Sequence, residues 1–243
     1  NQGRVAALGG DIVFVARRVE NHGTLAAPAG AVQLVGGTEV LLATPGSPAL
    51  ILAGSAAGEV ENSATGAIAA AQVRLEAAGR NPAALAINQA GLIRATGIES
   101  RGGEVWLVAS GPGRVVQQGE ISARNADQTG GAIRATGGQL LVAAGSTIDA
   151  SGPAGGGVVE LGGGERGATL TAAAANARET LVEAGATISA DALAAGSGGR
   201  VILWGTDALG FYGTATARGA NGGSGGFVET SGAWLDLFGR VET

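Results

Sequence analysis

The sequence predicts an all-β solenoid, a parallel β-helix with about 27 residues in each coil. The first reason is a repeated module, in which a glycine precedes alternating apolar residues and a polar loop then leads to a glycine pair. Its leading isoleucines Ile93, Ile121 and Ile148 are separated by 28 and 27 residues, and Ile188 and Ala215 again by 27. A fixed period in this range indicates stacked units, none of which can bury its apolar face alone.

The second and third reasons are the period within each unit and the length of its apolar segments. Apolar residues alternate with a period of two, as in Ile121-Ser122-Ala123, which is the period of a strand and not of a helix. Glycines interrupt these strands after three to five residues, so coils stacked in register are favoured over hairpins. Three short strands per coil and roughly nine coils, each about 4.8 Å from the next, would give a rod about 40 Å long.

The composition fits this fold as a single domain over residues 1–243. Of these residues 46 are glycine and 45% are hydrophobic, but only 3% are aromatic and 14% charged, which suits a narrow interior of small apolar side chains. The absence of cysteine excludes disulfides, thiolate metal sites and a cysteine nucleophile. A net charge of −5 with scattered arginines argues against nucleic-acid binding, and no apolar run approaches the ~18 residues of a membrane span. Because methionine is also absent, we expect a piece of a longer chain.

Residues 9–42 are expected to alternate between strands and glycine turns. The side chains expected to point into the interior there are Ile12, Phe14, Val19, Leu25, Val32, Leu34, Val40 and Leu42. Residues 43–60 contain two of the six prolines and are interpreted as an outward loop followed by a short strand at residues 50–52.

Later modules follow the same order, with a glycine pair before each second apolar step. These second steps are expected at Val105, Leu107, Ile133, Val158, Val159, Val201, Leu203 and Phe227. The step from Ile148 to Ile188 is 40 residues, which indicates an irregular insertion at about residues 162–184. Alanine-rich residues 168–184 would score as helix on propensity alone, so a short helix there is the alternative to an irregular coil.

The amino-acid sequence of residues 9–42 resembles the repeats that follow the secretion domain in filamentous-haemagglutinin-type exoproteins of bacterial two-partner secretion. The resemblance continues through residues 81–109 and 225–243, so it covers most of the chain. It implies a right-handed β-helix from a secreted or surface-bound exoprotein of a Gram-negative bacterium, whose parent chain an outer-membrane transporter recognises. The family's N-terminal secretion domain is expected to be missing, since Asn81-Pro82-Ala83-Ala84 matches its Asn-Pro-Asn motif only in part.

Two isolated signals of chemistry are weak. Residues 162–167 match the pattern G-x-G-x-x-G, but no βαβ unit surrounds them and glycine is abundant, so nucleotide binding is not expected. His22 is the only histidine and follows Asn21 in a turn, where a solvated side chain is expected. One histidine cannot supply a catalytic triad together with a zinc site.

The carboxylates need a closer test, because parallel β-helices also carry polysaccharide lyases and hydrolases. Asp127, Asp149, Asp191 and Asp207 are expected in loops or at strand ends, where stacking of coils could bring two of them within the ~5–9 Å of glycoside chemistry. Asp11 and residues 125–127 lie beside glycines and are the weak calcium candidates, without the tandem G-G-x-G-x-D repeat. Since these acids occupy different places in the repeat, we expect turn acids and no catalytic, cofactor or metal site.

Aromatic residues are concentrated towards the C-terminal end of the sequence. Six of the eight are Trp204, Phe211, Tyr212, Phe227, Trp234 and Phe238. The leading interpretation is that they fill or close the core, and the alternative is a stacking platform for sugar rings at Trp234 or Tyr212. Alternation in residues 233–237 places Trp234 with Asp236, opposite Leu235, and makes Trp234 the strongest candidate for exposure.

The predicted function is therefore mechanical and adhesive, a rod segment of an exoprotein that displays binding surfaces or builds a fibre. The alternative is a carbohydrate-active enzyme on the same scaffold. The expected partners are the transporter, a host-cell or matrix glycan or protein, and further coils. The last expectation comes from apolar segments near both ends, at residues 5–8 and 235–241, which coils of the same chain or stacked copies would cover.

Overall fold

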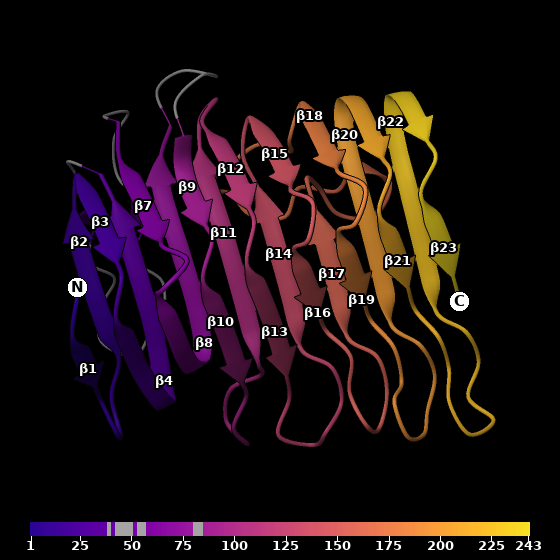
Figure 1. Cartoon of the computed structure of the whole chain (residues 1–243), viewed down its shortest axis with the longest axis horizontal. Coiled ribbons are helices and arrows are strands. Elements are labelled where there is room, and N and C mark those ends of the chain that lie inside the picture. The colour runs from indigo at the N-terminus through magenta and orange to yellow at the C-terminus, as the bar shows by residue number, and fades with distance from the viewer. Residues whose placement is uncertain (38–39, 42–50, 53–56, 80–84) are drawn as a thin grey trace.

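The chain winds into a right-handed parallel β-helix, which confirms the predicted fold class. The computed structural model describes residues 1–37, 40–41, 51–52, 57–79 and 85–243. Within them, 21 strands join in one network of parallel pairs, and the coils follow one another along a single axis from the N-terminal to the C-terminal end (Figure 1). Each coil contributes a strand, or part of a long strand, to each of three faces.

The first face is formed by short strands and by the N-terminal parts of two long ones, and each strand pairs in parallel with the next coil. Its members are β1 (Arg4–Ala6), β4 (Thr24–Gly36), β8 (Ala67–Ala78), β10 (Leu92–Thr96), β13 (Glu120–Arg124), β16 (Thr147–Asp149), β19 (Thr187–Ser189), β21 (Thr214–Thr216) and β23 (Arg240–Glu242).

The second face continues each coil around the next corner. It contains the C-terminal parts of β4 and β8, with β2 (Ile12–Ala16), β11 (Glu104–Ser110), β14 (Ala132–Thr136), β17 (Val158–Leu161) and the first parts of β20 (Arg200–Phe211) and β22 (Phe227–Leu237).

The third face completes the coil. It contains β3 (Arg18–Asn21), β7 (Glu59–Asn62), β9 (Leu85–Gln89), β12 (Arg114–Gln117), β15 (Gln139–Val142), β18 (Glu179–Val182) and the second parts of β20 and β22. Outside the coils, β5 (Val40–Leu41) and β6 (Ile51–Leu52) form a short antiparallel pair. The strand predicted at residues 50–52 corresponds to β6 in its last two residues, and Leu50 lies outside the described residues.

The register confirms the predicted isoleucine column on the first face. Ile93 lies opposite Ile121, which lies opposite Ile148, and the column continues to Ile188 and Ala215 despite the 40-residue step. All five are at most 1% exposed. Identical branched side chains stacked at every coil bury their apolar surface against each other, and this burial is the main stabilising term of the fold.

A second column on the second face is also as predicted. Its fully buried members in order are Val32, Val73, Val105, Ile133, Val159 and Val201. The column ends differently from the prediction, because Val228, and not Phe227, lies opposite Val201. Phe227 lies opposite Arg200 and is 45% exposed, so the inward prediction for Phe227 is wrong by one residue, and a shift of one residue reverses the direction of a strand side chain.

The remaining inward predictions near the N-terminal end hold with one difference. Ile12, Val19 and Leu25 are buried, whereas Phe14 is only partly buried against the core. The predicted inward positions of Val40 and Leu42 lie outside the described side chains, as does the proline-containing loop at residues 43–50.

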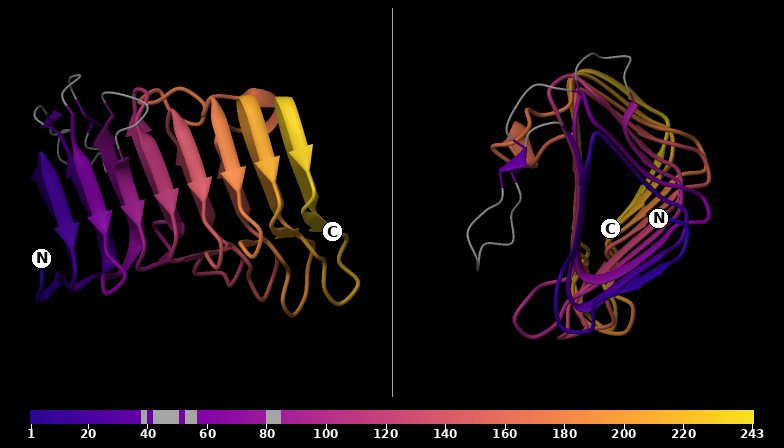
Figure 2. Two further views of the ribbon diagram at one scale, coloured as in Figure 1. Left: turned by 45° about the horizontal axis from the view of Figure 1, so that its top comes forward. Right: turned by 90° about the vertical axis from the view of Figure 1, so that its left-hand side faces the viewer.

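The insertion between β17 and β18 is shorter than predicted. β18 begins at Glu179, so residues 179–182 already belong to a regular coil. Glu165–Gly167 form one 3₁₀ turn, and no α-helix forms between residues 168 and 184, where an irregular segment with one bridge from Thr171 to Ala174 is found. The helical alternative is therefore wrong, and the insertion lies as an orange loop outside the coils in the end-on view of Figure 2. No helix of the described residues is long and apolar enough to cross a membrane.

Candidate functional site

Each of the four acids proposed for catalysis is used for local contacts. Asp127 accepts hydrogen bonds from the hydroxyl and the backbone N–H of Thr129, at 2.6 and 3.0 Å. These hydrogen bonds lower the pKa of Asp127 below its ordinary value, although the carboxylate is solvated. Asp149 accepts one from the backbone N–H of Ser151 at 2.8 Å. Asp127 lies in a turn and Asp149 is the last residue of β16, which are the loop and strand-end positions expected from the sequence.

Asp191 is the one acid of this group that is buried, at 4% exposed. It accepts hydrogen bonds from the Thr216 hydroxyl at 3.0 Å, and from the backbone N–H and guanidinium of Arg218 at 2.7 and 2.6 Å. The carboxylate raises the pKa of Arg218, first through the hydrogen bond and then through its charge. Asp207 binds Arg178 at 2.7 Å on the surface. Each of these acids is therefore committed to an arginine, which leaves neither as a free general acid or base.

The calcium candidates are likewise engaged with protein groups. Asp11 accepts hydrogen bonds from the Ala31 N–H at 2.8 Å and from Arg101 at 3.1 Å. The Asn125 side chain accepts from the Gly103 N–H at 2.9 Å, so it joins two coils. Across the described ranges, no three His, Cys, Asp or Glu side chains gather as a metal site would require.

The G-x-G-x-x-G segment has a packing explanation. A Cβ atom at Gly163 or Gly167 would come within 2.8 or 2.7 Å of the indole of Trp204, so glycine lets the insertion lie directly on this ring. The segment forms a 3₁₀ turn and does not open a helix, so it offers no phosphate-binding helix terminus. His22 lies in a turn with its Nε2 3.5 Å from a carboxylate oxygen of Glu20, on a partly exposed side chain.

The two candidate sugar-stacking residues occupy different surroundings. Trp234 lies on β22, where its side chain points away from the core of the solenoid and is 72% exposed. The Tyr212 hydroxyl donates a hydrogen bond to the Asp236 carboxylate, and its ring stacks on Phe238 with centroids 6.1 Å apart. This hydrogen bond, followed by burial and the nearby negative charge, raises the pKa of Tyr212. Of the six aromatics near this end only Phe211 is fully buried, so the other five do not fill the interior, and the prediction that the group closes the core stays untested.

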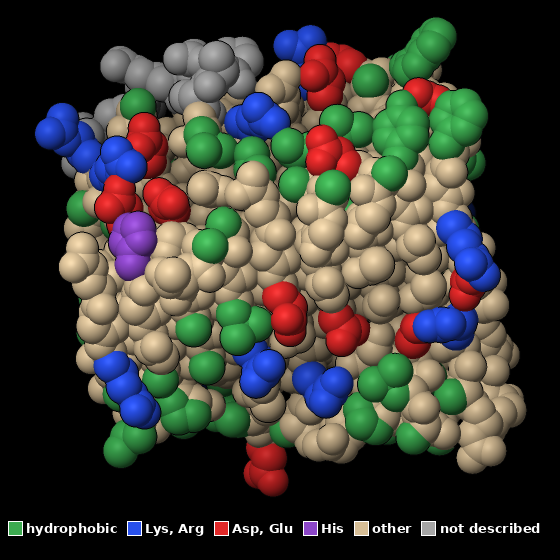
Figure 3. All heavy atoms as spheres, viewed as in Figure 1, with side chains coloured by type: hydrophobic (Ala, Val, Ile, Leu, Met, Phe, Trp, Pro, Cys, Tyr) green, Lys and Arg blue, Asp and Glu red, His purple; other side chains and the backbone are tan. Residues whose placement is uncertain are grey.

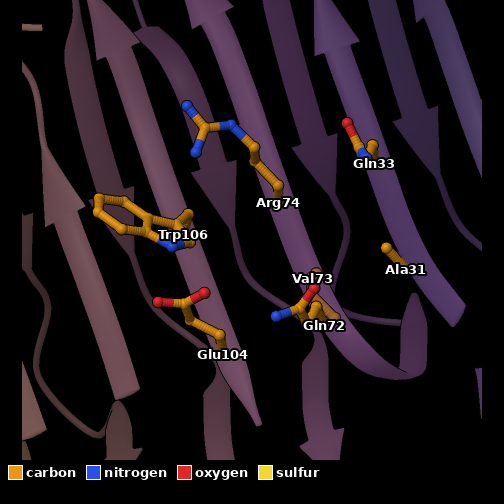
Figure 4. A pocket seen from close by; sticks show the side chains of 7 residues that line it. All are labelled: Ala31, Gln33, Gln72, Val73, Arg74, Glu104 and Trp106. Carbon is orange, nitrogen blue, oxygen red and sulfur yellow. The ribbon is translucent and has the colours of Figure 1, made fainter. Parts of the chain in front are cut away.

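Sequence reasoning missed a small hollow on the outer side of the second face. It holds about 130 Å³ and is lined by Ala31, Gln33, Gln72, Val73, Arg74, Glu104 and Trp106 (Figure 4). The guanidinium carbons of Arg74 and Arg134, on the two neighbouring strands, lie 5.5 and 5.0 Å from the Trp106 ring centroid. Because a cation lies over the ring from each side, Trp106 has no free face for a sugar, and its role is to stabilise this face.

A larger groove crosses the outer side of the first face over β10, β13 and β16. It holds about 460 Å³, and its polar lining is Arg94, Thr96, Glu120, Ser122, Arg124, Gln128, Asp149 and Ser151. Figure 3 shows basic and acidic side chains together in the lower middle of this side of the molecule, where these strands lie in Figure 1. This groove was not predicted from the sequence, because its residues come from three coils.

Comparison with known proteins gives an informative match among solved structures. No protein-family model matches the sequence, and no curated protein matches it either. Among solved structures, the chain is similar to the HMW1 secretion domain from Haemophilus influenzae, with a TM-score of 0.79 and 29% sequence identity. The alignment covers 99% of this chain and 64% of that chain, so this chain spans less than two thirds of its length. The similarity supports a relationship to secreted exoproteins of the two-partner type, without assigning the chain to the filamentous-haemagglutinin group.

Proposed function

We propose that the chain is part of the secretion domain of a two-partner exoprotein of a Gram-negative bacterium, and that an outer-membrane transporter recognises it during export. The observation that carries the proposal is the match of 99% of the chain to the HMW1 secretion domain at 29% identity. The sequence resemblance placed the chain after such a domain. The proposal places it within one, because the similar structure is itself described as a secretion domain.

The architecture suits export through a pore followed by folding outside. Each coil contacts mainly the coils before and after it, so a solenoid can fold by addition of one coil at a time as the chain emerges. Column residues such as Ile121 and Ile148 meet their partners one coil away. The chain has no cysteine, so its folding outside the cell does not depend on forming a disulfide. In the parent protein we propose that this segment also begins the adhesive rod, whose outer faces are available to a host-cell or matrix ligand.

The export proposal is tested by giving residues 1–243 a cleavable signal peptide and expressing them in a Gram-negative host, with and without a two-partner transporter. The expected result is the chain in the medium only when the transporter is present. A matched control carries the same signal peptide on an unrelated periplasmic protein and should stay in the periplasm in both strains. Retention of the chain in the periplasm in the presence of its cognate transporter would overturn the proposal.

We also propose that the chain is not an enzyme. The support is that Asp127, Asp149 and Asp207 are each bound to a neighbouring protein group. Incubation with uronate-containing and neutral polysaccharides should release no new reducing ends. Turnover that is lost when one of these three acids is changed to asparagine would favour the polysaccharide lyase or hydrolase alternative.

A further inference from the structure

The groove on the first face contains two arginines that the protein itself does not neutralise. Most arginines of the described residues form an ion pair, whereas Arg94 and Arg124 form none there. The Nε atom of Arg124 is buried and has no hydrogen-bond partner among the described residues. A buried donor without a partner is costly, so a bound acceptor that turns this guanidinium outwards into the groove would remove a penalty that the free protein carries.

The register places both guanidinium groups on the same side of the face. On β10 and β13, Arg94 lies opposite Ser122, and Thr96 lies opposite Arg124. The two arginines are thus one strand and two residues apart, which is roughly 8 Å between their Cα atoms. Two guanidinium forks at this separation can converge on a single carboxylate.

Acceptors lie beside the two arginines, because Glu120 is one strand and two residues from Arg94, and Asp149 is one strand and two residues from Arg124. Asp149 uses one oxygen for the Ser151 N–H, and Glu120 is exposed, so carboxylate oxygens of both remain available to hydroxyl donors. The donors and the acceptors of this groove do not pair with each other in the described structure. A ligand that combines one carboxylate with several hydroxyl groups would satisfy both the donors and the acceptors, and a sugar acid is such a ligand. We propose that the groove binds a uronate residue of an acidic polysaccharide.

A polymer fits the surroundings of the groove better than an extended peptide. Beyond it along the axis, the first face presents a row of threonine hydroxyls at Thr147, Thr187 and Thr214. The backbone groups of these strands are already paired on both sides within the parallel ladder, so no strand edge is free for peptide addition. The volume of about 460 Å³ is that of a small-ligand site. This inference goes beyond the proposed export route and does not depend on it.

Calorimetric titration with trigalacturonate tests the proposal, and its methyl ester is the matched ligand because esterification removes the carboxylate charges and keeps the sugar rings and their hydroxyl groups. We expect trigalacturonate to bind and the ester to bind at least about tenfold more weakly, since charge-assisted hydrogen bonds are lost. The variants Arg94→Gln and Arg124→Gln should each weaken binding by a similar factor. Arg17→Gln is the matched protein control, because Arg17 is exposed, forms no ion pair in the described chain and lies outside the groove.

Unchanged thermal melting of the three variants would show that the arginines act on the ligand and not on folding. The proposal is overturned if trigalacturonate does not bind, if the ester binds equally well, or if both groove variants keep the affinity of the unchanged chain. An acidic peptide that binds as tightly as trigalacturonate would also overturn it, because the groove would then recognise charge alone. None of these outcomes bears on transporter-dependent export, so the two proposals fail separately.

Discussion

One interior position of the coil is filled in two different ways along the axis. It is the last residue of each strand on the third face, at the corner where the coil turns towards the first face. In the N-terminal coils this position holds the amides Asn21, Asn62, Gln89 and Gln117, and in the C-terminal coils it holds Val142, Val182 and Phe211. All seven side chains are at most 1% exposed.

The amides form a ladder that joins successive coils. The Asn21 amide donates to Asn62 at 2.8 Å, and the Asn62 amide donates to Gln89 at 2.8 Å. Gln89 in turn donates to the Gly91 carbonyl at 2.8 Å. The ladder ends there, because Gln117 donates to the Gly119 carbonyl and its side-chain oxygen finds no partner in the described part of the chain.

Register and burial are therefore specified by different residues in the two regions. An apolar corner gains free energy from burial in any register, whereas an amide corner is satisfied only when each coil lies opposite the correct partner. The N-terminal coils therefore contain side chains that specify the register between successive coils. The C-terminal coils contribute burial of apolar surface at the same corner.

The largest effect is expected at a column that both regions share. Ile133 is fully buried in the second column, and Ile133→Asp would remove its apolar contacts and place an unpaired carboxylate in the core. We expect a loss of more than about 4 kcal/mol in the free energy of unfolding, measured by urea denaturation. Ala132→Asp, on the partly exposed side of the same strand, is the control and should have little effect. If the Ile133 variant melted within about two degrees of the unchanged chain, the proposed register would be contradicted.

A smaller but still large effect is expected in the ladder. Asn62→Leu would leave the donor of Asn21 and the acceptor of Gln89 buried without partners, which should cost about 2–4 kcal/mol in urea denaturation. Changing Asn21 to leucine as well should recover part of this loss, because the orphaned donor is then removed. A single variant as stable as the unchanged chain would mean that the ladder does not hold these coils together.

The ladder also shows which parts of the fold the sequence could predict. The isoleucine columns were predictable because identical residues recur at the coil period. Asn21 and Asn62 are 41 residues apart, and Asn21 precedes His22 and Gly23, a combination typical of a solvated turn. The groove arginines were missed for a related reason, because whether an arginine has a partner depends on side chains one coil away. Sequence period predicts which positions stack, but not which polar groups pair across the stack.

A near-zero effect is expected at the last amide of the same column. Gln117→Leu removes a side chain whose oxygen has no partner among the described residues, and the Gly119 carbonyl that it contacts already accepts the Thr147 N–H at 3.1 Å. We expect the free energy of unfolding to change by less than about 1 kcal/mol, or to rise. A loss as large as that of Asn62→Leu would show that the amide side chains stabilise the fold by their packing and not by their hydrogen bonds.

The smallest effect concerns pH and the C-terminal coils. There Phe211 points into the apolar corner, and the next residue, Tyr212, lies outside it and donates its hydroxyl to Asp236. Because the folded state raises the pKa of Tyr212 above its ordinary value of 10.0, this contact stabilises the fold below pH 10 and is lost as the pH rises through the raised pKa. Tyr212 is the only tyrosine, so the phenolate absorbance of the folded chain reports its titration alone. We expect a midpoint above 10.0 that moves back towards 10.0 in Asp236→Asn, and a midpoint that this change does not move would show that Asp236 does not cause the shift.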